Sequence, residues 1–451
     1  MGLHLHLHST PRWLRYAVLA ITALTLAPTS APAQEKARRV SVETLLYDLK
    51  SPDPLRRQTA VRELGIAKIR SATPQLVAMV HDSSDSVRRE VELSLERMDD
   101  PQAMPGFIAL ASDNASDIRA RAVASLVSMH LPHAIGVGGM LTKLGELVTF
   151  ASDRDLDVVV EPEIRVDPTV IETLRARVGD SERGIRRTAI RGLGILRGRP
   201  AVPDLLQVVR EDRDDGLRFE AARAIRKIGD ASVASSLVAL LNINSDTVRN
   251  ELIETLGSMR DHGAVSELTR IVEVATRPDR PCVLALAALA DIADPASVAL
   301  FDRHKADKNE AMRLYANEGV ARTAEPGQKT AISAARLIEK SPRVRAAQAF
   351  ALLRIGEGEY MDELIRALEQ PPTRELAKEY LLETKPADRA ALFAPRPVRS
   401  GARADLADLF GRIGDPEALP RLQELARDTD GDVKRAAEKA ARRLAGGSGS
   451  Q

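Results

Sequence analysis

"DTVRNELIETLG" (246–257) is one copy of a pattern that recurs along the chain. "DSVRREVELSL" (85–95), "SDIRARAVASL" (116–126) and "DGLRFEAARAI" (215–225) keep its order of polar, basic and apolar residues. The residues one before, three after and seven after the basic residue are mainly apolar. Positions four apart lie on one face of a helix, so the stretch predicts an amphipathic helix. Its recurrence predicts a repeat architecture.

The copies are evenly spaced when the basic residue is taken as the anchor of each. Successive anchors lie 29 to 33 residues apart, except for one interval of 67. Eleven of the twelve anchors are Arg or Lys, and the residue seven positions on is apolar in all twelve. One structural unit therefore recurs twelve times. The anchors are Arg57, Arg88, Arg119, Arg186, Arg218, Arg249, Cys282, Arg313, Arg345, Arg374, Arg403 and Lys434.

A second apolar stripe precedes each anchor, as in "AVPDLLQVVRE" (201–211) and "YMDELIRALE" (360–369). Turn-forming joints such as "IGDPEA" (413–418) separate the stripes. Each unit is therefore expected to be two antiparallel helices, which cannot bury their apolar faces alone and must stack. The predicted fold is all-α, a right-handed α-solenoid of about twelve helical hairpins, on the order of 100 Å long.

"FGRIGDPEALPRLQEL" (410–425) and "KRAAEKAARRL" (434–444) carry a resemblance. They resemble the HEAT-repeat family, in the short form found in phycobilin lyases. The resemblance covers about residues 41–444. It is specific for the fold, so it leaves the function open.

In that family the acid-x-Val-Arg element implies a ladder of ion pairs between stacked units. Asp and Glu three residues before an anchor match it here, and they also suit a helix start. The resemblance therefore implies a structural role for these residues. They are Asp85, Asp215 and Asp246, with Glu310, and the anchors Arg88, Arg119, Arg186, Arg218, Arg249 and Arg313.

"DLDVVVEPEIRVDP" (155–168) lies in the interval of 67 residues and is rich in β-branched residues. The interval is close to two periods, so we expect the stretch to fill a vacant helix slot. Residues 158–160 and 164–166 could form a short β-hairpin around "EPE", and its edge could dock a partner. The alternative is an irregular, degenerate repeat. The candidate docking residues are Asp155, Asp157, Val159, Glu161, Glu163 and Arg165.

The N-terminus is typical of a secretory signal peptide. Arg12 and Arg15 precede the apolar run "YAVLAITALTLA" (16–27), and Ala31 and Ala33 suit cleavage after Ala33. The run is too short to span a bilayer, so we expect an exported chain, periplasmic or secreted, with no membrane insertion after cleavage. The expected division is 1–33 signal peptide, 34–133 repeats, 134–180 irregular repeat, 181–445 repeats and 446–451 flexible tail.

Composition limits the classes of partner and site. The formal charge is +1 and aromatic residues make up 3% of the chain, which gives no case for nucleic acid binding. The single cysteine, Cys282, lies in an apolar stretch and is expected to be a small buried residue.

No sequence motif indicates catalysis or a cofactor. The histidines are scattered, and "HLPH" (130–133) has no acid or cysteine nearby. Deoxyhypusine hydroxylase, an enzyme built from HEAT-type repeats, holds iron through His-Glu pairs, and no His-Glu dipeptide occurs here. "DTDGDV" (428–433) has Val433 and Lys439 where a calcium loop needs Gly and Glu, so we interpret it as a helix cap. We expect no catalytic, cofactor or metal residues.

The leading functional hypothesis is an exported, non-catalytic scaffold that binds a protein or peptide through the concave face of the solenoid. One alternative is an enzyme or a lyase-like accessory factor with a site in the groove. A structural spacer in a cell-envelope complex is the other alternative.

Overall fold

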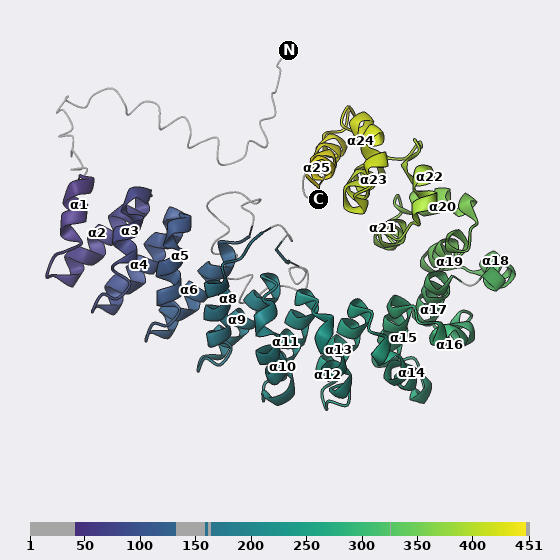
Figure 1. Cartoon of the computed structure of the whole chain (residues 1–451), viewed down its shortest axis with the longest axis horizontal. Coiled ribbons are helices and arrows are strands. Elements are labelled where there is room, and N and C mark those ends of the chain that lie inside the picture. Colours follow the sequence, from purple (N-terminus) through teal and green to yellow (C-terminus); the bar gives the residue numbers. More distant parts are fainter. Residues whose placement is uncertain (1–40, 132–157, 161–163, 325, 448–451) are drawn as a thin grey trace, which may run out of the picture.

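The computed structural model describes residues 41–131, 158–160, 164–324 and 326–447. In these ranges the chain forms twelve helical hairpins that stack side by side into a curved array (Figure 1). The prediction of an all-α solenoid of about twelve hairpins is confirmed for this part of the chain. Its right-handed sense stays a prediction.

Each repeat has a first helix followed by a second helix. The first helices are α1 (Val42–Asp48), α3 (Thr73–Val77), α5 (Met104–Leu110), α8 (Pro168–Arg177), α10 (Val202–Glu211), α12 (Ala234–Ala239), α14 (Val265–Val274), α16 (Val298–His304), α18 (Lys329–Ile338), α20 (Met361–Ala367), α22 (Arg389–Phe393) and α24 (Leu419–Leu425). The second helices are α2 (Pro54–Ile66), α4 (Asp85–Met98), α6 (Ser116–Ser128), α9 (Arg183–Ile195), α11 (Asp215–Ile228), α13 (Asp246–Met259), α15 (Arg280–Ile292), α17 (Glu310–Thr323), α19 (Pro342–Arg354), α21 (Arg374–Leu382), α23 (Ser400–Ile413) and α25 (Gly431–Gly447).

Short 3-10 turns lead into most first helices. They are η2 (Arg70–Ala72), η3 (Pro101–Ala103), η5 (Arg199–Ala201), η6 (Ala231–Val233), η7 (His262–Ala264), η8 (Pro295–Ser297), η9 (Pro326–Gln328), η10 (Gly358–Tyr360), η11 (Pro386–Asp388) and η12 (Pro416–Ala418).

Polar side chains fix where second helices begin. Asp279 accepts a hydrogen bond from the N–H of Cys282, and Asn309 accepts from the N–H groups of Ala311 and Met312. These caps satisfy backbone donors that have no partner inside the helix. Asp430 accepts N–H groups of α25 in the same way, which confirms the capping interpretation of "DTDGDV".

The second helices approach each other closely at a small residue. A Cβ on Gly257 would lie 2.8 Å from the Cα of Ala288 in the next repeat, and one on Gly194 would lie 2.8 Å from the Cα of Ala224. Glycine eight residues after the anchor therefore faces a small residue six after the next anchor. Gly65 with Ser94 and Gly411 with Ala440 follow the same rule.

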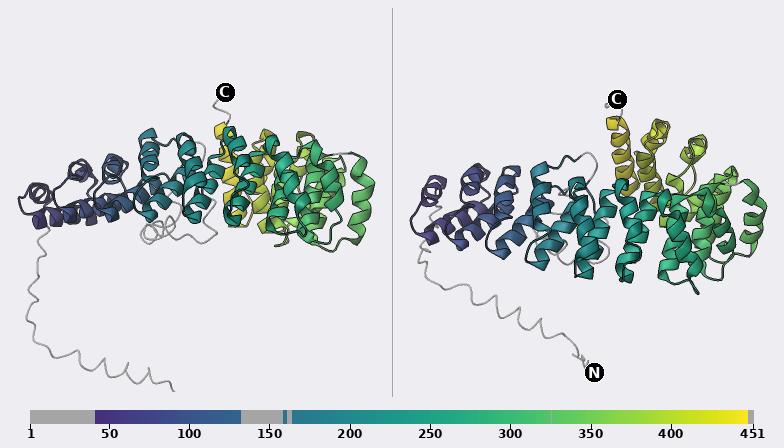
Figure 2. Two further views of the ribbon diagram at one scale, coloured as in Figure 1. Left: turned by 90° about the horizontal axis from the view of Figure 1, so that it is seen from below. Right: turned by 60° about the horizontal axis from the view of Figure 1, so that its bottom comes forward.

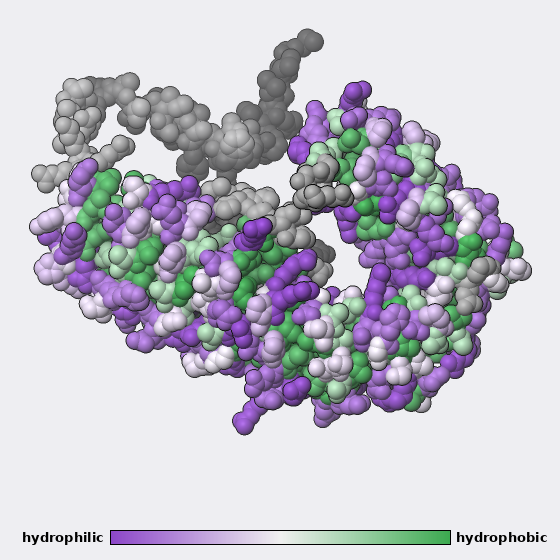
Figure 3. All heavy atoms as spheres, in the orientation of Figure 1, coloured by the Kyte–Doolittle hydropathy of each residue, from purple (hydrophilic) through white to green (hydrophobic). Residues whose placement is uncertain are grey.

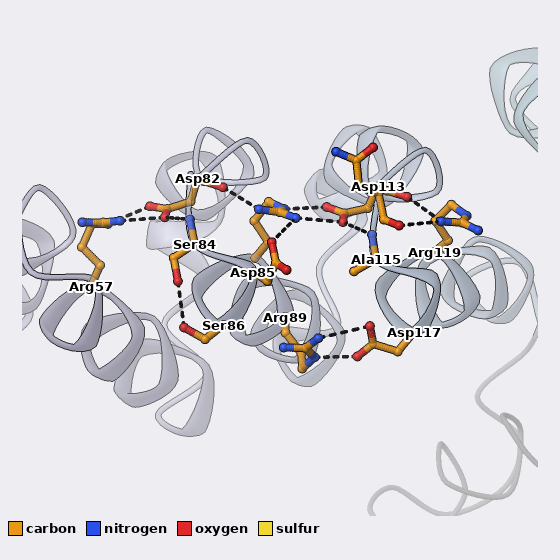
Figure 4. A network of polar contacts seen from close by, with 12 residues as sticks. Arg57, Asp82, Ser84, Asp85, Ser86, Arg89, Asp113, Ala115, Asp117 and Arg119 are labelled. Atoms are coloured by element: carbon orange, nitrogen blue, oxygen red, sulfur yellow. Dashed lines mark hydrogen bonds and ion pairs between the residues drawn. The ribbon is translucent and has the colours of Figure 1, made fainter.

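An ion-pair ladder joins neighbouring repeats at the loop edge of the array (Figure 4). Arg57 binds Asp82 through two N···O contacts of 2.7 Å, and Arg88 binds Asp113 at 2.6 and 3.0 Å. Each carboxylate also accepts a hydrogen bond from the backbone N–H two residues further on. Each aspartate therefore fixes its own loop while it holds the preceding repeat.

The acids that join repeats lie six residues before the next anchor, rather than three as the family resemblance implied. Asp85 binds Arg88 at 2.7 Å within one helix. Asp215–Arg218 and Asp246–Arg249 also stay within one helix, at 2.9 and 3.0 Å. The pairs between repeats are Arg57–Asp82, Arg88–Asp113, Arg119–Asp180, Arg186–Asp212 (3.9 Å), Arg313–Glu339 and Arg403–Asp428.

The long interval between anchors does not contain a vacant helix slot. Arg119 of α6 binds Asp180, which lies just before α9, with both N···O distances 3.0 Å. Helix α6 packs directly on α9, as α4 packs on α6. The residues between α6 and α8 are therefore an insertion between two adjacent repeats.

The β-hairpin expected in that insertion is not present in its described residues. Residues 158–160 and 164–167 belong to no strand. Val160 is instead 3% exposed, and its N–H donates to the carbonyl of Ile195 at the end of α9. Lys227 donates to the carbonyl of Val158. Burial against the repeats satisfies this backbone without a partner strand. The expected turn, 161–163, lies outside the described residues.

The array is curved, and its two layers of helices lie on opposite sides of the curve. From α10 onward the first helices lie on the outer side of the arc and the second helices on the inner side (Figure 1). Side views show the array as a narrow band of paired helices (Figure 2). Within the described residues, no helix is long and apolar enough to cross a membrane. The expected signal peptide lies outside these residues, as do residues 448–451 of the expected tail, whereas 446–447 end helix α25.

Candidate binding site on the inner surface

Six residues from three repeats meet on the inner surface of the C-terminal half, and we call them the inner-face cluster. Asp291 lies at the end of α15, and Glu318 and Arg322 lie on α17. The others come from α21 and its C-terminal cap, three repeats beyond α15 and two beyond α17. They are Glu379, Tyr380 and Glu383.

Arg322 holds the cluster together. Its guanidinium binds Glu383 at 2.9 Å, Asp291 at 3.0 Å and Glu318 at 3.4 Å. Only 8% of its side chain is exposed. Such charge-assisted contacts are strong, and Arg can make several at once because its five donors lie in one plane.

Tyr380 links α21 to α17 across the repeat between them. Its hydroxyl donates to Glu318 at 2.6 Å, and its ring stacks on Phe350 of α19 at a centroid distance of 4.5 Å. Tyr380 is fully buried. The contact brings helices two repeats apart into one polar network, so the inner surface is tightly curved here.

The carboxyl groups of Glu318, Asp291 and Glu379 are unusually hard to ionise. Burial raises the pKa of Glu318 to about 7, although Arg322 and the Tyr380 hydroxyl oppose the shift. Burial likewise raises the pKa of Asp291 and Glu379 above the ordinary range, and their neighbouring carboxylates add to the effect. Convergent groups with perturbed pKa values mark candidate functional sites.

Part of the cluster remains open to solvent. Asp291 keeps 45% of its side chain exposed, and Glu379 is also exposed. The inward side of the C-terminal half is mostly hydrophilic (Figure 3). Four carboxyl groups, three of them in contact with Arg322, surround one guanidinium, so the site attracts positive charge.

The residues singled out by sequence lie elsewhere. The ladder anchors occupy the first turns of the second helices, at the loop edge. Of the candidate docking residues, Val159 is half-buried and Arg165 is exposed. Asp155, Asp157, Glu161 and Glu163 lie outside the described residues. Cys282 is buried as expected, and burial raises its pKa to about 11.

Sequence reasoning missed the inner-face cluster, although a signal for it exists. Acids stand five or nine residues after the anchor in several repeats of the C-terminal half, and these positions share one helix face. They are Glu254, Asp291, Glu318, Glu379, Glu383 and Asp408.

Comparison with known families agrees with this architecture. The family model for HEAT repeats matches residues 42–127, 163–225 and 202–287, and that for the PBS lyase HEAT-like repeat matches 402–428. The chain belongs to the HEAT-repeat family. The sequence resemblance to these repeats is therefore confirmed.

Two curated relatives of this HEAT-repeat chain are enzymes. Deoxyhypusine hydroxylase of Rattus norvegicus is 25% identical over 237 residues, which are 51% of this chain and 74% of that protein. Deoxyhypusine hydroxylase-B of Oryza sativa subsp. japonica is 24% identical over 243 residues, covering 51% and 75%.

Two solved structures align with this chain at low identity. Human deoxyhypusine hydroxylase in complex with glycerol is 20% identical, with a TM-score of 0.28 and coverage of 55% of this chain and 96% of that one. Kap121p bound to Nup53p is 12% identical, with a TM-score of 0.44 and coverage of 89% and 56%.

The residues of this chain do not fit an iron site of the His-Glu kind. No His-Glu dipeptide occurs in the sequence. His262 contacts Asp294 at 2.6 Å, His304 contacts Asp307 at 3.1 Å, and His130 contacts the carbonyl of Leu126. Among the described residues, no three His, Cys, Asp or Glu side chains gather in a metal-binding arrangement.

Proposed function

We propose that this chain is an exported, non-catalytic scaffold that binds a protein or peptide through the inner surface of its HEAT-repeat arc. The partner segment is basic, and it lies along α15, α17 and α21. The observation that carries the proposal is the inner-face cluster, in which three carboxylates bind Arg322 and a fourth, Glu379, interacts with it electrostatically. Asp291 is partly exposed and Glu379 is exposed.

The N-terminal half supports this location by contrast. Arg62 binds Glu90 of the next repeat at 3.1 Å, and Arg191 binds Glu220 of the next repeat. In these two pairs an arginine of one repeat is matched by an acid of the next. The inner-face cluster carries an excess of acid, so a cation from outside can complete it.

Export follows from the N-terminal sequence. The basic residues, the short apolar run and Ala33 support cleavage after residue 33. Expression of the full chain with its own N-terminus, followed by intact mass measurement of the exported protein, tests this. A mature chain starting at Gln34 supports export, and an uncleaved chain confined to the cytoplasm contradicts it.

Capture of partners tests the binding role. Residues 34–451 serve as bait for crosslinking in the exported fraction, at low and high salt. Asp291→Asn with Glu379→Gln removes two exposed charges and should reduce capture about tenfold, because exposed charges steer and hold a basic partner. The matched control is Glu182→Gln with Glu417→Gln, two exposed acids away from the cluster.

Two outcomes contradict the binding role. Equal capture by the two double variants would place the binding surface elsewhere. Capture of no partner at all, with the chain still present in envelope complexes, would favour a structural spacer.

An enzyme or enzyme accessory factor is the second candidate. The similarity to deoxyhypusine hydroxylases and the raised pKa of Glu318 favour it. An activity that titrates near pH 7 and disappears in Glu318→Gln, while partner capture persists, would support the enzyme. Loss of capture without any such activity would support the scaffold.

A further inference from the structure

An open pocket lies on the outer side of the array, around the exposed helix α18. Side chains of α18, the first turn of α19 and η10 line it. Helix α18 stands at the outer edge of the arc (Figure 1). The residues that line the pocket and matter here are Lys329, Thr330, Ser333, Arg336, Leu337 and Arg345.

Arg345 is a ladder anchor that lacks its ladder partner. The acid that should bind it belongs six residues before Arg374, and Leu368 stands there, 2% exposed. Within the described residues, every other anchor arginine contacts a carboxylate, whether of its own helix or of another repeat. Arg345 is exposed and lines the pocket instead.

The other cations of the pocket already have partners. Lys329 binds Glu357 at 2.7 Å, and Arg336 binds Glu363 while its guanidinium lies 5.2 Å from the ring centre of Tyr360. Arg345 is therefore the cation that the pocket offers to a ligand. Thr330 and Ser333 add hydroxyl groups to the lining, and both can donate hydrogen bonds to an anion.

Beside this cation lies the most exposed aliphatic surface of the described residues. Leu337 is 88% exposed and Ile338 is 81% exposed, whereas Ile332 on the same helix is 1% exposed. A single exposed aliphatic residue is ordinary, but Leu337 lines the pocket and Ile338 follows it directly in the chain, so the two provide adjacent apolar surface. The pocket thus joins a cationic group to an aliphatic patch.

We infer that this outer pocket binds an acidic, aliphatic segment of a partner protein. A carboxylate of the segment takes the place of the missing ladder acid at Arg345, and neighbouring aliphatic side chains cover Leu337 and Ile338. The ladder itself identifies the ligand, because carboxylates of Asp and Glu bind the anchors of six other second helices across a repeat boundary at 3.0 Å or less. This surface differs from the inner-face cluster in position and in the sign of charge.

Synthetic peptides test the ligand chemistry on purified residues 34–451. Four labelled ten-residue peptides serve as probes: Asp and Leu alternating, Asn and Leu alternating, Lys and Leu alternating, and Asp and Ser alternating. Fluorescence anisotropy should give the tightest binding for the Asp-Leu peptide. The Asn-Leu and Asp-Ser peptides should bind about tenfold more weakly, since each lacks one of the two contacts.

Variants test the site. Arg345→Gln, and separately Leu337→Ser with Ile338→Ser, should each weaken the Asp-Leu peptide about tenfold. Arg210→Glu on α10 and Ile66→Ser on α2 are matched controls, because both residues are exposed elsewhere on the array. A crosslinking group introduced at position 337, in place of Leu337, should react with the bound Asp-Leu peptide.

Three results would overturn the inference. The Asp-Leu peptide could bind equally well to Arg345→Gln and to the native chain, or the Lys-Leu peptide could bind more tightly than it. The third result is that light scattering finds a dimer for the native chain and a monomer for Leu337→Ser with Ile338→Ser. The patch would then be a contact between two copies of this chain.

Discussion

Arg119 and Asp180 are separated by 61 residues in sequence, yet they form the same two-contact ion pair that joins Arg88 to Asp113 over 25 residues. The repeat that contains α9 is therefore stacked directly on the repeat that contains α6. The insertion between them leaves the stacking order unchanged.

Replacing residues 135–155 with a Gly-Ser linker of equal length should therefore leave the repeats folded. We expect the melting temperature to stay within about 3 °C of the native value. Differential scanning calorimetry checks this. A transition that splits into two, or that falls by much more, would show that the inserted sequence holds the two halves together.

The two aspartates on Arg88 should differ in their contribution to stability. Asp113 is 5% exposed and joins two repeats, whereas Asp85 is 66% exposed and stays within its helix. Asp113→Ala leaves Arg88 without its partner across the interface, and should lower the free energy of unfolding by about 2 to 3 kcal/mol. Asp85→Ala should cost about 0.5 kcal/mol. Urea denaturation of the two variants compares them, and equal effects would refute the structural ladder.

Glycine at the helix contacts should be intolerant of a methyl group. Gly257→Ala places a Cβ 2.8 Å from the Cα of Ala288, so the helices must separate, at about 1 to 3 kcal/mol. Gly184→Ala, in α9, is the control, because a Cβ there meets nothing within 4 Å. That change should be neutral or stabilising by up to about 1 kcal/mol, since Ala favours helix. Thermal unfolding of both variants measures the difference.

Glu92 should make stability fall as pH rises. It is fully buried, Oε2 has no hydrogen-bond partner within the described residues, and burial raises its pKa to about 8. Between pH 4.5 and about 8 the folded chain keeps a proton that the unfolded chain releases, so stability is lost over this range.

Glu92→Gln removes that dependence. At pH 9 it should stabilise the chain by on the order of 3 kcal/mol, and at pH 4.5 it should change little, because Glu92 is then neutral. Urea midpoints across pH measure the slope. The exposed Glu63→Gln is the control. A native slope unchanged in Glu92→Gln would show that other groups titrate.

Much of the fold could be predicted from the sequence because its information is local. Apolar residues at fixed offsets from each anchor specify one helix face, and the period specifies the stacking. The insertion was misinterpreted because 67 residues is close to two periods, a coincidence that only the Arg119–Asp180 contact resolves. The family resemblance places the ladder acid three residues before the anchor, whereas in the structure it lies six before. Both kinds of acid bind the same arginine, because Asp85 and Asp113 both bind Arg88.

The inner-face cluster was out of reach for a different physical reason. Tyr380 and Glu318 are 62 residues apart and meet only because the array curves strongly enough to bring α21 onto α17. The curvature of the array depends on how the helices pack at each interface between repeats, and it cannot be predicted from the sequence of a single repeat. The repeated acids five and nine residues after the anchor could have suggested an acidic face, but not its closure around Arg322.

The ladder also predicts how the protein responds to force. Where the ladder is complete, from α2 to α9, an ion pair joins each two neighbouring repeats at the loop edge. From α11 to α15 the ladder positions hold Ile243 and Thr276, so Arg218 and Arg249 bind only acids of their own helices. Tension applied to the two ends should therefore separate the repeats from α11 to α15 before it separates those joined by ladder pairs. The inner-face cluster begins at α15, the C-terminal end of that segment. The spacing between its side chains should therefore depend on how the two ends of the array are held.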